Sequence, residues 1–82
     1  MEEKRSASRR KVLKGAHAVF NDGRSTISCI VRNLSDDGAL LRFDSVIGLP
    51  DAFVLALSDG TRRACAIQRR SGTEVGVTFL PD

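Results

Sequence analysis

The stretch that decides the fold is residues 25–43, STISCIVRNLSDDGALLRF, in which two apolar segments flank a polar turn. Apolar side chains alternate with other side chains in both segments, which is the period of a β-strand with one buried face. The residues expected to face inward are Ile27, Cys29, Val31, Ala39, Leu41 and Phe43. The segment from Asn33 to Gly38 is rich in Ser, Asp and Gly, which favour chain reversal. We therefore predict two consecutive strands joined by a polar turn.

The same alternation recurs through the rest of the chain. The turn signals Asp22-Gly23, Asp59-Gly60 and Ser71-Gly72 separate the alternating segments. Strands are expected over residues 12–20, 25–33, 38–43, 53–57, 61–70 and 74–80. Several short strands with regular turn signals and no segment of helical period favour an all-β sandwich or barrel. Closure into a barrel would remove exposed sheet edges in so small a domain.

The positive charge of the chain is concentrated near its N-terminus. Residues 1–14 carry six basic and two acidic side chains, a net charge of +4, whereas the remainder carries seven arginines and eight acidic residues. Residues 1–11 have no apolar periodicity, so we predict a flexible basic arm there and a barrel over residues 12–82. Such an arm suits capture of a compact anion or an acidic surface. The alternative is a solvated tail that only aids solubility.

Composition indicates a soluble, single-domain protein of 82 residues. The sequence has no apolar run approaching the roughly 18 residues of a membrane span, and no apolar stretch typical of a signal peptide, so we expect a cytoplasmic protein. Cys29 and Cys65 lie far apart within apolar strand patterns, and we expect two buried thiols without a disulfide. His17 is the only histidine, so no metal site is expected.

The sequence offers little for catalysis. His17 has no Ser, Cys or acidic residue at an informative spacing, and Asp36 and Asp37 are adjacent in a turn, where their side chains tend to diverge. The chain also lacks a glycine-rich phosphate loop followed by Lys and Ser or Thr. We expect no catalytic residues, no cofactor and no enzymatic activity.

An anion-binding site is better supported by the sequence. Arg5 and Arg9 are four residues apart, and an arginine fork binds phosphate oxygens or the O6 and N7 acceptors of guanine. Asn33 and Ser35 supply short polar side chains at a strand end. Gly38 permits a positive φ and lets a ligand approach the backbone closely, and successive backbone N–H groups in such a turn can form an anion-binding concavity.

These two motifs together resemble the PilZ domain family. That family is marked by R-x-x-x-R in an N-terminal arm and [D/N]-x-S-x-x-G farther along the chain. The matching residues are Arg5 and Arg9, then Asn33, Ser35 and Gly38. The segments Arg63-Ala-Cys65-Ala-Ile67 and Gly76-Val77-x-Phe79 also resemble the family, so the likeness covers nearly the whole chain.

The resemblance implies a six-stranded antiparallel β-barrel whose ligand is the bacterial second messenger cyclic di-GMP. Arg5 and Arg9 would grip guanine and phosphate, and Asn33, Ser35 and Gly38 would hold the other side of the ligand. Binding would order the arm against the barrel, and an unidentified effector protein would read that change. A role in motility or biofilm regulation follows from the same resemblance.

The register of the arginine pair stays open at this point. Arg10 and Lys14 form a competing pair at the same spacing, so Arg10 is also a candidate ligand-binding residue. Many members of the family carry a helix after the last strand, whereas this sequence stops at Asp82.

Two other readings of the function stay open. A PilZ-like barrel that does not bind the ligand would serve only as a protein-interaction module. A small barrel that binds nucleic acid is less favoured, because such surfaces need aromatic stacking platforms. The chain has no Trp or Tyr, and its four Phe residues all fall in inward rows.

Overall fold

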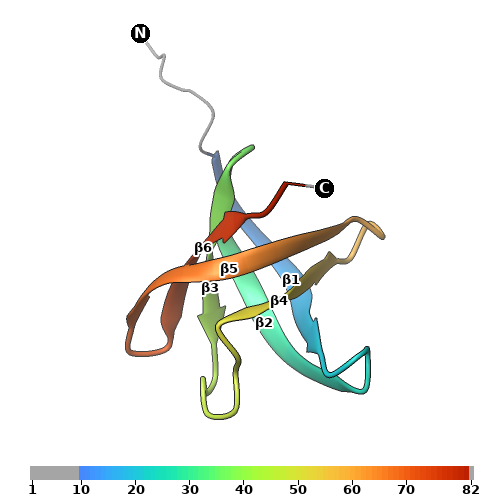
Figure 1. Ribbon diagram of the computed structural model, residues 1–82. Helices are drawn as coiled ribbons and strands as arrows, with labels where there is room; N and C mark the ends of the chain where they lie inside the picture. Colours follow the sequence, from blue (N-terminus) through green and yellow to red (C-terminus); the bar gives the residue numbers. More distant parts are fainter. Residues whose placement is uncertain (1–9, 82) are drawn as a thin grey trace, which may run out of the picture.

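Six β-strands make up the part of the chain that the structure describes. The structure is a computed structural model that describes residues 10–81, with side chains described from residue 13 onward. The strands are β1 (Arg10–Phe20), β2 (Ser25–Leu34), β3 (Gly38–Phe43), β4 (Ala52–Leu57), β5 (Arg62–Ser71) and β6 (Glu74–Phe79). Figure 1 shows β5 crossing the front of the molecule, with β1, β2 and β3 behind it.

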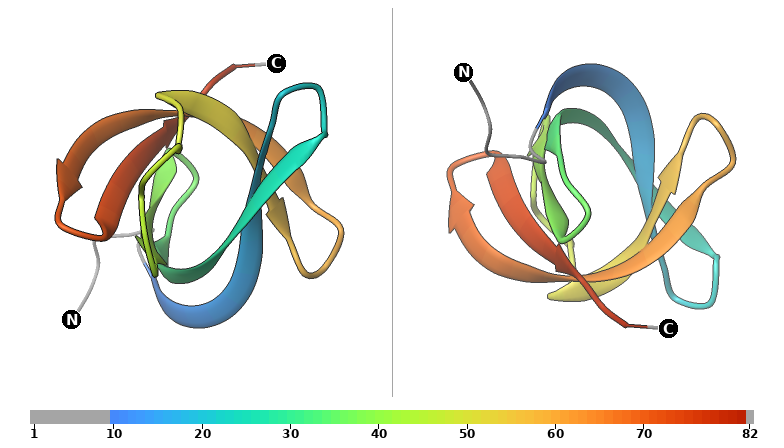
Figure 2. Two further views of the ribbon diagram at one scale, coloured as in Figure 1. Left: turned by 90° about the horizontal axis from the view of Figure 1, so that it is seen from below. Right: turned by 90° about the horizontal axis from the view of Figure 1, so that it is seen from above.

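The strands close into a barrel in the order β1-β2-β3-β6-β5-β4, and every neighbouring pair is antiparallel. The pairing of β4 with β1 closes the ring, which is seen end-on in Figure 2. The predicted all-β class and the six-stranded antiparallel barrel are therefore confirmed. The predicted arm lies outside the described residues except for its last two positions.

The first strand begins two residues earlier than the sequence pattern indicates. Arg10 is paired with Leu34 and Lys11 with Asn33, so β1 extends back to Arg10 instead of starting at Val12. A register shift between Lys11 and Lys14 interrupts the alternation of side chains. An irregularity of this kind hides the strand from a search for period two.

The inward side chains form one core of buried apolar residues. They are Ala16, Ala18, Cys29, Val31, Leu41, Phe43, Leu49, Phe53, Leu55, Cys65, Val75, Val77 and Phe79. Phe43 and Phe53 meet edge to face, with ring centroids 6.5 Å apart. Burial of each large apolar side chain contributes about 1.5–3 kcal/mol to stability, so the alternation in sequence becomes the main source of stability.

Both cysteines are buried and free, as the sequence predicted. Burial raises the pKa of the Cys29 thiol to about 11. Burial also raises the pKa of Cys65 to about 12, and the nearby Cys29 adds to this effect. The Cys65 thiol donates a hydrogen bond of 3.5 Å to the carbonyl oxygen of Phe53.

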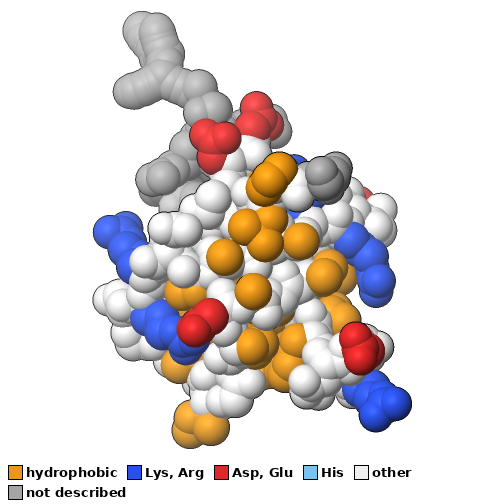
Figure 3. Space-filling view, viewed as in Figure 1, with side chains coloured by type: hydrophobic (Ala, Val, Ile, Leu, Met, Phe, Trp, Pro, Cys, Tyr) orange, Lys and Arg blue, Asp and Glu red, His pale blue; other side chains and the backbone are white. Residues whose placement is uncertain are grey.

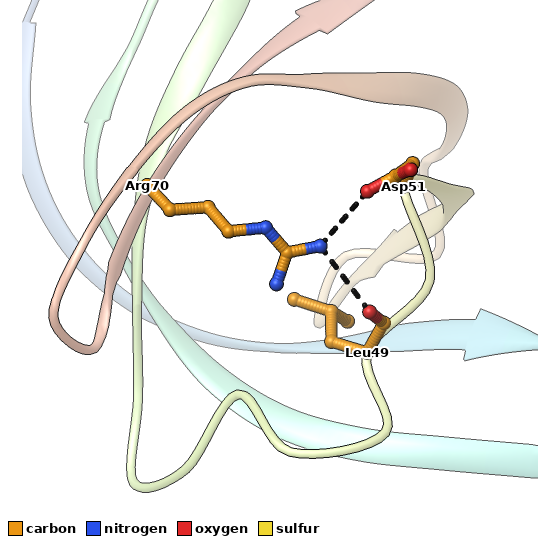
Figure 4. Close-up of polar contacts among 3 residues, drawn as sticks. All are labelled: Leu49, Asp51 and Arg70. Carbon is orange, nitrogen blue, oxygen red and sulfur yellow. Dashed lines mark hydrogen bonds and ion pairs between the residues drawn. The ribbon is translucent and has the colours of Figure 1, made fainter.

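Leu49 enters the core from the loop between β3 and β4. The side chain of Arg70 fixes this loop by donating to the carbonyl oxygen of Leu49 at 3.4 Å and to Asp51 Oδ1 at 3.0 Å (Figure 4). Because the Asp51 side chain is 93% exposed, the ion pair itself adds about 0–1 kcal/mol. The burial of Leu49 is the larger contribution.

The outer surface over β4 and β5 is largely apolar. Ala52 is paired with Ala66 and Val54 with Ala64, and these side chains alternate with the core residues of the same strands. Figure 3 shows hydrophobic side chains across the middle of the face that β5 crosses, with charged side chains around them. The described residues include no helix with the length and apolarity needed to cross a membrane.

Candidate ligand-binding site

A pocket of about 300 Å³ lies on the outside of the barrel beside the turn between β2 and β3. It is lined by residues 33–35 and 37–40 around that turn, by residues 68–69 of β5 and by residues 76–78 of β6. Asn33, Ser35 and Gly38, which the sequence predicted as ligand-binding residues, all line it. The structure thus brings together the three predicted residues that it describes in full.

The strand register explains why a hollow forms here. Lys11 is paired with Asn33, Asn33 with Leu40, Leu40 with Gly76, and Gly76 with Arg69. This row crosses five neighbouring strands. Since Gly76 has no side chain, the row has a gap between Leu40 and Arg69.

Ser35 holds the turn together through its hydroxyl group. Ser35 Oγ accepts the N–H groups of Asp37 at 3.3 Å and Gly38 at 3.2 Å, and lies 3.3 Å from the carbonyl oxygen of Gly38, to which it donates. The backbone N–H of Ser35 also donates to that carbonyl at 2.9 Å. The N–H groups of Asp37 and Gly38 are thus bonded to Ser35 Oγ, and the turn does not present them to a ligand.

Gly38 is required for a reason that the sequence analysis did not identify. Its φ is not positive, so this position does not use the left-handed conformation that glycine permits. Instead, Gly38 is buried against β6, and a Cβ at this position would overlap the carbonyl oxygen of Val77. The N–H of Phe79 also donates to the carbonyl oxygen of Asp37 at 2.7 Å. The turn is therefore fixed to β6 on the inner side of the pocket.

The described pocket residues carry one positive and one negative side chain. Arg69 lies on the β5 side and Asp37 on the turn side. Their charges offset each other, so these residues alone provide no net attraction for a phosphate group. A phosphate ligand would need additional cations from outside the described residues.

The predicted arginines of the arm lie at or before the first residue that the structure describes, Arg10. Arg5 and Arg9 lie outside the described residues. Arg10 is the first residue of β1 and is paired with Leu34, which lines the pocket, although the Arg10 side chain is not described. Lys14, which forms the alternative basic pair with Arg10, is paired with Val31 and does not line the pocket. Figure 1 shows the start of β1 beside the β2–β3 turn.

Sequence reasoning missed the contribution of β5 and β6 to this site. Gln68, Arg69 and Thr78 line the pocket because of the pairing of β6 with both β3 and β5. A register shift between Ile67 and Arg69 marks a β-bulge that no local pattern reveals. Gly76 was the available signal, because a glycine inside a strand often marks close approach of a ligand or another backbone.

No protein-family model matches this chain, and no curated protein matches it. The resemblance to the PilZ family therefore stays an expectation from the sequence motifs. Among the described residues there is also no cluster of three or more His, Cys, Asp or Glu side chains suited to a metal ion.

Proposed function

We propose that this chain is a PilZ-type receptor for cyclic di-GMP and acts as an adaptor for an effector protein. The observation that carries the proposal is that Asn33, Ser35 and Gly38 line one pocket, beside the point where the chain arrives from Arg5 and Arg9. In this account Asn33 and Ser35 provide polar contacts at the edge of the turn. Arg5 and Arg9 provide the charge that the pocket itself lacks.

Chain geometry supports access of the arginines to the pocket. Arg9 is bonded to Arg10, which is paired with the pocket residue Leu34. Five residues of extended chain span at most about 18 Å, so the Cα atom of Arg5 lies within that distance of the Arg10 Cα atom. Both arginines are therefore within reach of a ligand that contacts the β2–β3 turn.

The chemistry of arginine also fits the proposed ligand. Each phosphate of a cyclic dinucleotide carries a negative charge, and an arginine fork binds phosphate oxygens through two parallel hydrogen bonds. The pocket volume of about 300 Å³ is at the lower end of the range for small-molecule sites. A segment that closes over an open pocket would complete the enclosure of the ligand.

The proposed signal is the docking of the arm. In the absence of ligand, the like charges of Arg5, Arg9, Arg10 and Lys11 repel one another. A bound dianion removes this repulsion and joins the arm to the barrel surface near Asn33. The effector then recognises a surface that exists only in the bound state.

Titration calorimetry with cyclic di-GMP tests the proposal, with GTP as the control ligand. Saturable binding of the cyclic dinucleotide alone is the expected result, and its stoichiometry separates one bound ligand from a stacked pair. Arg9→Ala is expected to abolish binding and to leave the thermal unfolding midpoint unchanged. Arg24→Ala, in the exposed β1–β2 turn, is the matched control. Equal affinity of the Arg9→Ala and wild-type proteins would contradict the assigned site.

A second candidate is a ligand-independent protein-interaction module. The observation that favours it is the apolar outer surface over β4 and β5, which includes Ala52, Val54, Ala64 and Ala66. Protein partners bind such surfaces through burial of apolar area. A set of captured partners that is the same with and without cyclic di-GMP, and that is lost in Val54→Glu, would favour this candidate.

A further inference from the structure

We propose that a purine base of the ligand stacks on the flat guanidinium group of Arg69, and that Gly76 leaves the space in which the Arg69 side chain lies. This inference rests on the proposed function and deepens it, because it adds a base-binding subsite on the barrel itself. The subsite is separate from the arginines of the arm and from the Asn33–Gly38 turn. The following observations carry it.

Gly76 has no structural need to be glycine. Its φ is not positive, and a Cβ there would meet only Arg69 Cγ at 3.6 Å and Arg69 Nε at 3.8 Å, which are ordinary contacts. Gly38 is the opposite case, because a Cβ there would overlap the backbone of Val77. A glycine in a strand interior is destabilising by about 0.5–1 kcal/mol relative to alanine, so Gly76 is a local weakness that packing does not explain.

The side chain of Arg69 lies across the gap that Gly76 leaves. Both Cγ and Nε of Arg69 are within 4 Å of the Cβ position of Gly76, so the side chain follows the sheet surface at this point. The register of β5 against β6 shifts between Ile67 and Arg69, directly before this side chain. Bulges commonly aim a side chain at a binding site.

Arg69 differs from the arginines that stabilise the barrel. Arg32 and Arg70 form ion pairs, and the Arg63 guanidinium lies 4.3 Å from the centroid of the Phe79 ring. The contact described for Arg69 is with Gly76 instead, on the lining of the pocket. Among the described contacts, the position of Arg69 is therefore defined by Gly76 and by the pocket lining.

A guanidinium group is the flat surface that this pocket has available. The chain has no Trp or Tyr, and none of its Phe rings lines the pocket. A planar guanidinium stacks on an aromatic face, and it loses little hydration in doing so. With Leu40 next to Gly76 in the row, the base would rest on Arg69 with an apolar side chain at its edge.

The first test compares cyclic di-GMP affinity of Arg69→Ala and Arg69→Lys by calorimetry. Loss of one stacked base weakens binding roughly 5- to 100-fold. Lysine keeps the charge but not the plane, so Arg69→Lys is expected to lose nearly as much affinity as Arg69→Ala. Arg62→Ala, an exposed residue of the same strand outside the pocket, is the control and is expected to bind as wild type. Wild-type affinity for cyclic di-GMP in Arg69→Ala or in Arg69→Lys would contradict the proposal that a base stacks on Arg69.

The dependence of affinity on salt separates this subsite from the arm. The slope of log affinity against log salt concentration reports the number of charge contacts to phosphate. Arg9→Ala is expected to flatten this slope, whereas Arg69→Lys is expected to keep it and to lower affinity at every salt concentration. A slope in Arg69→Ala as flat as in Arg9→Ala would mean that Arg69 contacts phosphate and does not stack.

The second test fills the gap directly. Gly76→Val places a branched side chain beneath Arg69 and is expected to weaken binding at least as much as Arg69→Ala, with an equal or higher unfolding midpoint. Gly15→Val is the matched control, since nothing lies within 4 Å of a Cβ at that strand position. Wild-type affinity in Gly76→Val would contradict the subsite alone, whereas failure of the wild-type protein to bind would contradict the proposed function.

Discussion

The two connections that flank β3 share a sequence pattern and differ in structure. The turn before β3 contains Ser35-x-x-Gly38, and the loop after it contains Ser45-x-x-Gly48. Gly48 has a φ of 85° with open space around it, whereas Gly38 is pressed against the carbonyl group of Val77 without a positive φ. The same four-residue pattern, Ser-x-x-Gly, thus meets two different physical requirements.

The hydroxyl groups of the two serines also accept different numbers of backbone hydrogen bonds. Ser35 Oγ accepts two backbone N–H groups, whereas Ser45 Oγ accepts the N–H of Ile47 alone, at 3.2 Å. The loop after β3 is held instead by the buried Leu49 and by Arg70. The comparison teaches that long-range contact with β6, together with the hydrogen bonds of Ser35, gives the first turn a fixed shape beside a pocket.

Gly38→Ala against Gly48→Ala gives the largest expected difference. The added methyl group at Gly38 forces the turn away from Val77, at a cost of about 3 kcal/mol in the free energy of unfolding. At Gly48 the same change costs about 1 kcal/mol, because only the left-handed backbone is strained. Urea unfolding measures both. Equal losses in the two variants would show that contact with β6 does not distinguish the turns.

Ser35→Ala against Ser45→Ala gives an intermediate difference. Because Gly38 is buried, loss of Ser35 Oγ leaves its N–H without the acceptor seen here, and we expect a loss of about 1–2 kcal/mol. The exposed N–H of Ile47 is solvated when Ser45 is changed, so that loss is expected to stay below about 0.5 kcal/mol. Amide hydrogen exchange at Gly38 and Ile47 checks the local origin, and unchanged exchange at Gly38 would argue against the hydroxyl contact.

A change of pH from 8 to about 9.5 gives the smallest expected effect, and it acts on the core that supports both connections. The pKa values of Cys29 and Cys65 are raised from 9.0 to about 11 and about 12 in the folded chain. Their contribution to stability is complete below pH 9 and is lost as the pH rises toward 11, because only the unfolded chain releases thiol protons in that window. The unfolding midpoint should fall in this range, and less so in Cys29→Ala. An equal fall in that variant would exclude the thiol as the cause.

The sequence carried enough information to predict the strands and to single out three residues that line one pocket. Alternation over most of β2 through β6 reports burial directly, since a strand places every second side chain in the core. Asn33, Ser35 and Gly38 are near one another in sequence, so their proximity in space follows from a short turn. The prediction of those three residues therefore needed no knowledge of the barrel.

The rest of the pocket depends on contacts between distant strands. Arg69 lies beside the pocket because β6 pairs with both β3 and β5, and neither this pairing nor the register shift before Arg69 leaves a local signature. The steric need for glycine at position 38 could not be predicted, because the obstacle, Val77, is far along the chain. Leu49 was missed in the core because a single apolar residue in a loop has no periodicity to reveal its burial.

Nuclear magnetic resonance of the labelled chain during a titration with cyclic di-GMP tests the central claim most directly. The account predicts saturable shifts of the backbone amides of residues 33–38, 68–69 and 76–78, and unchanged amides in the loop of residues 44–51. GTP at the same concentrations should leave both regions unchanged. An absence of saturable shifts, or shifts confined to the loop after β3, would contradict the assignment of the pocket as the binding site.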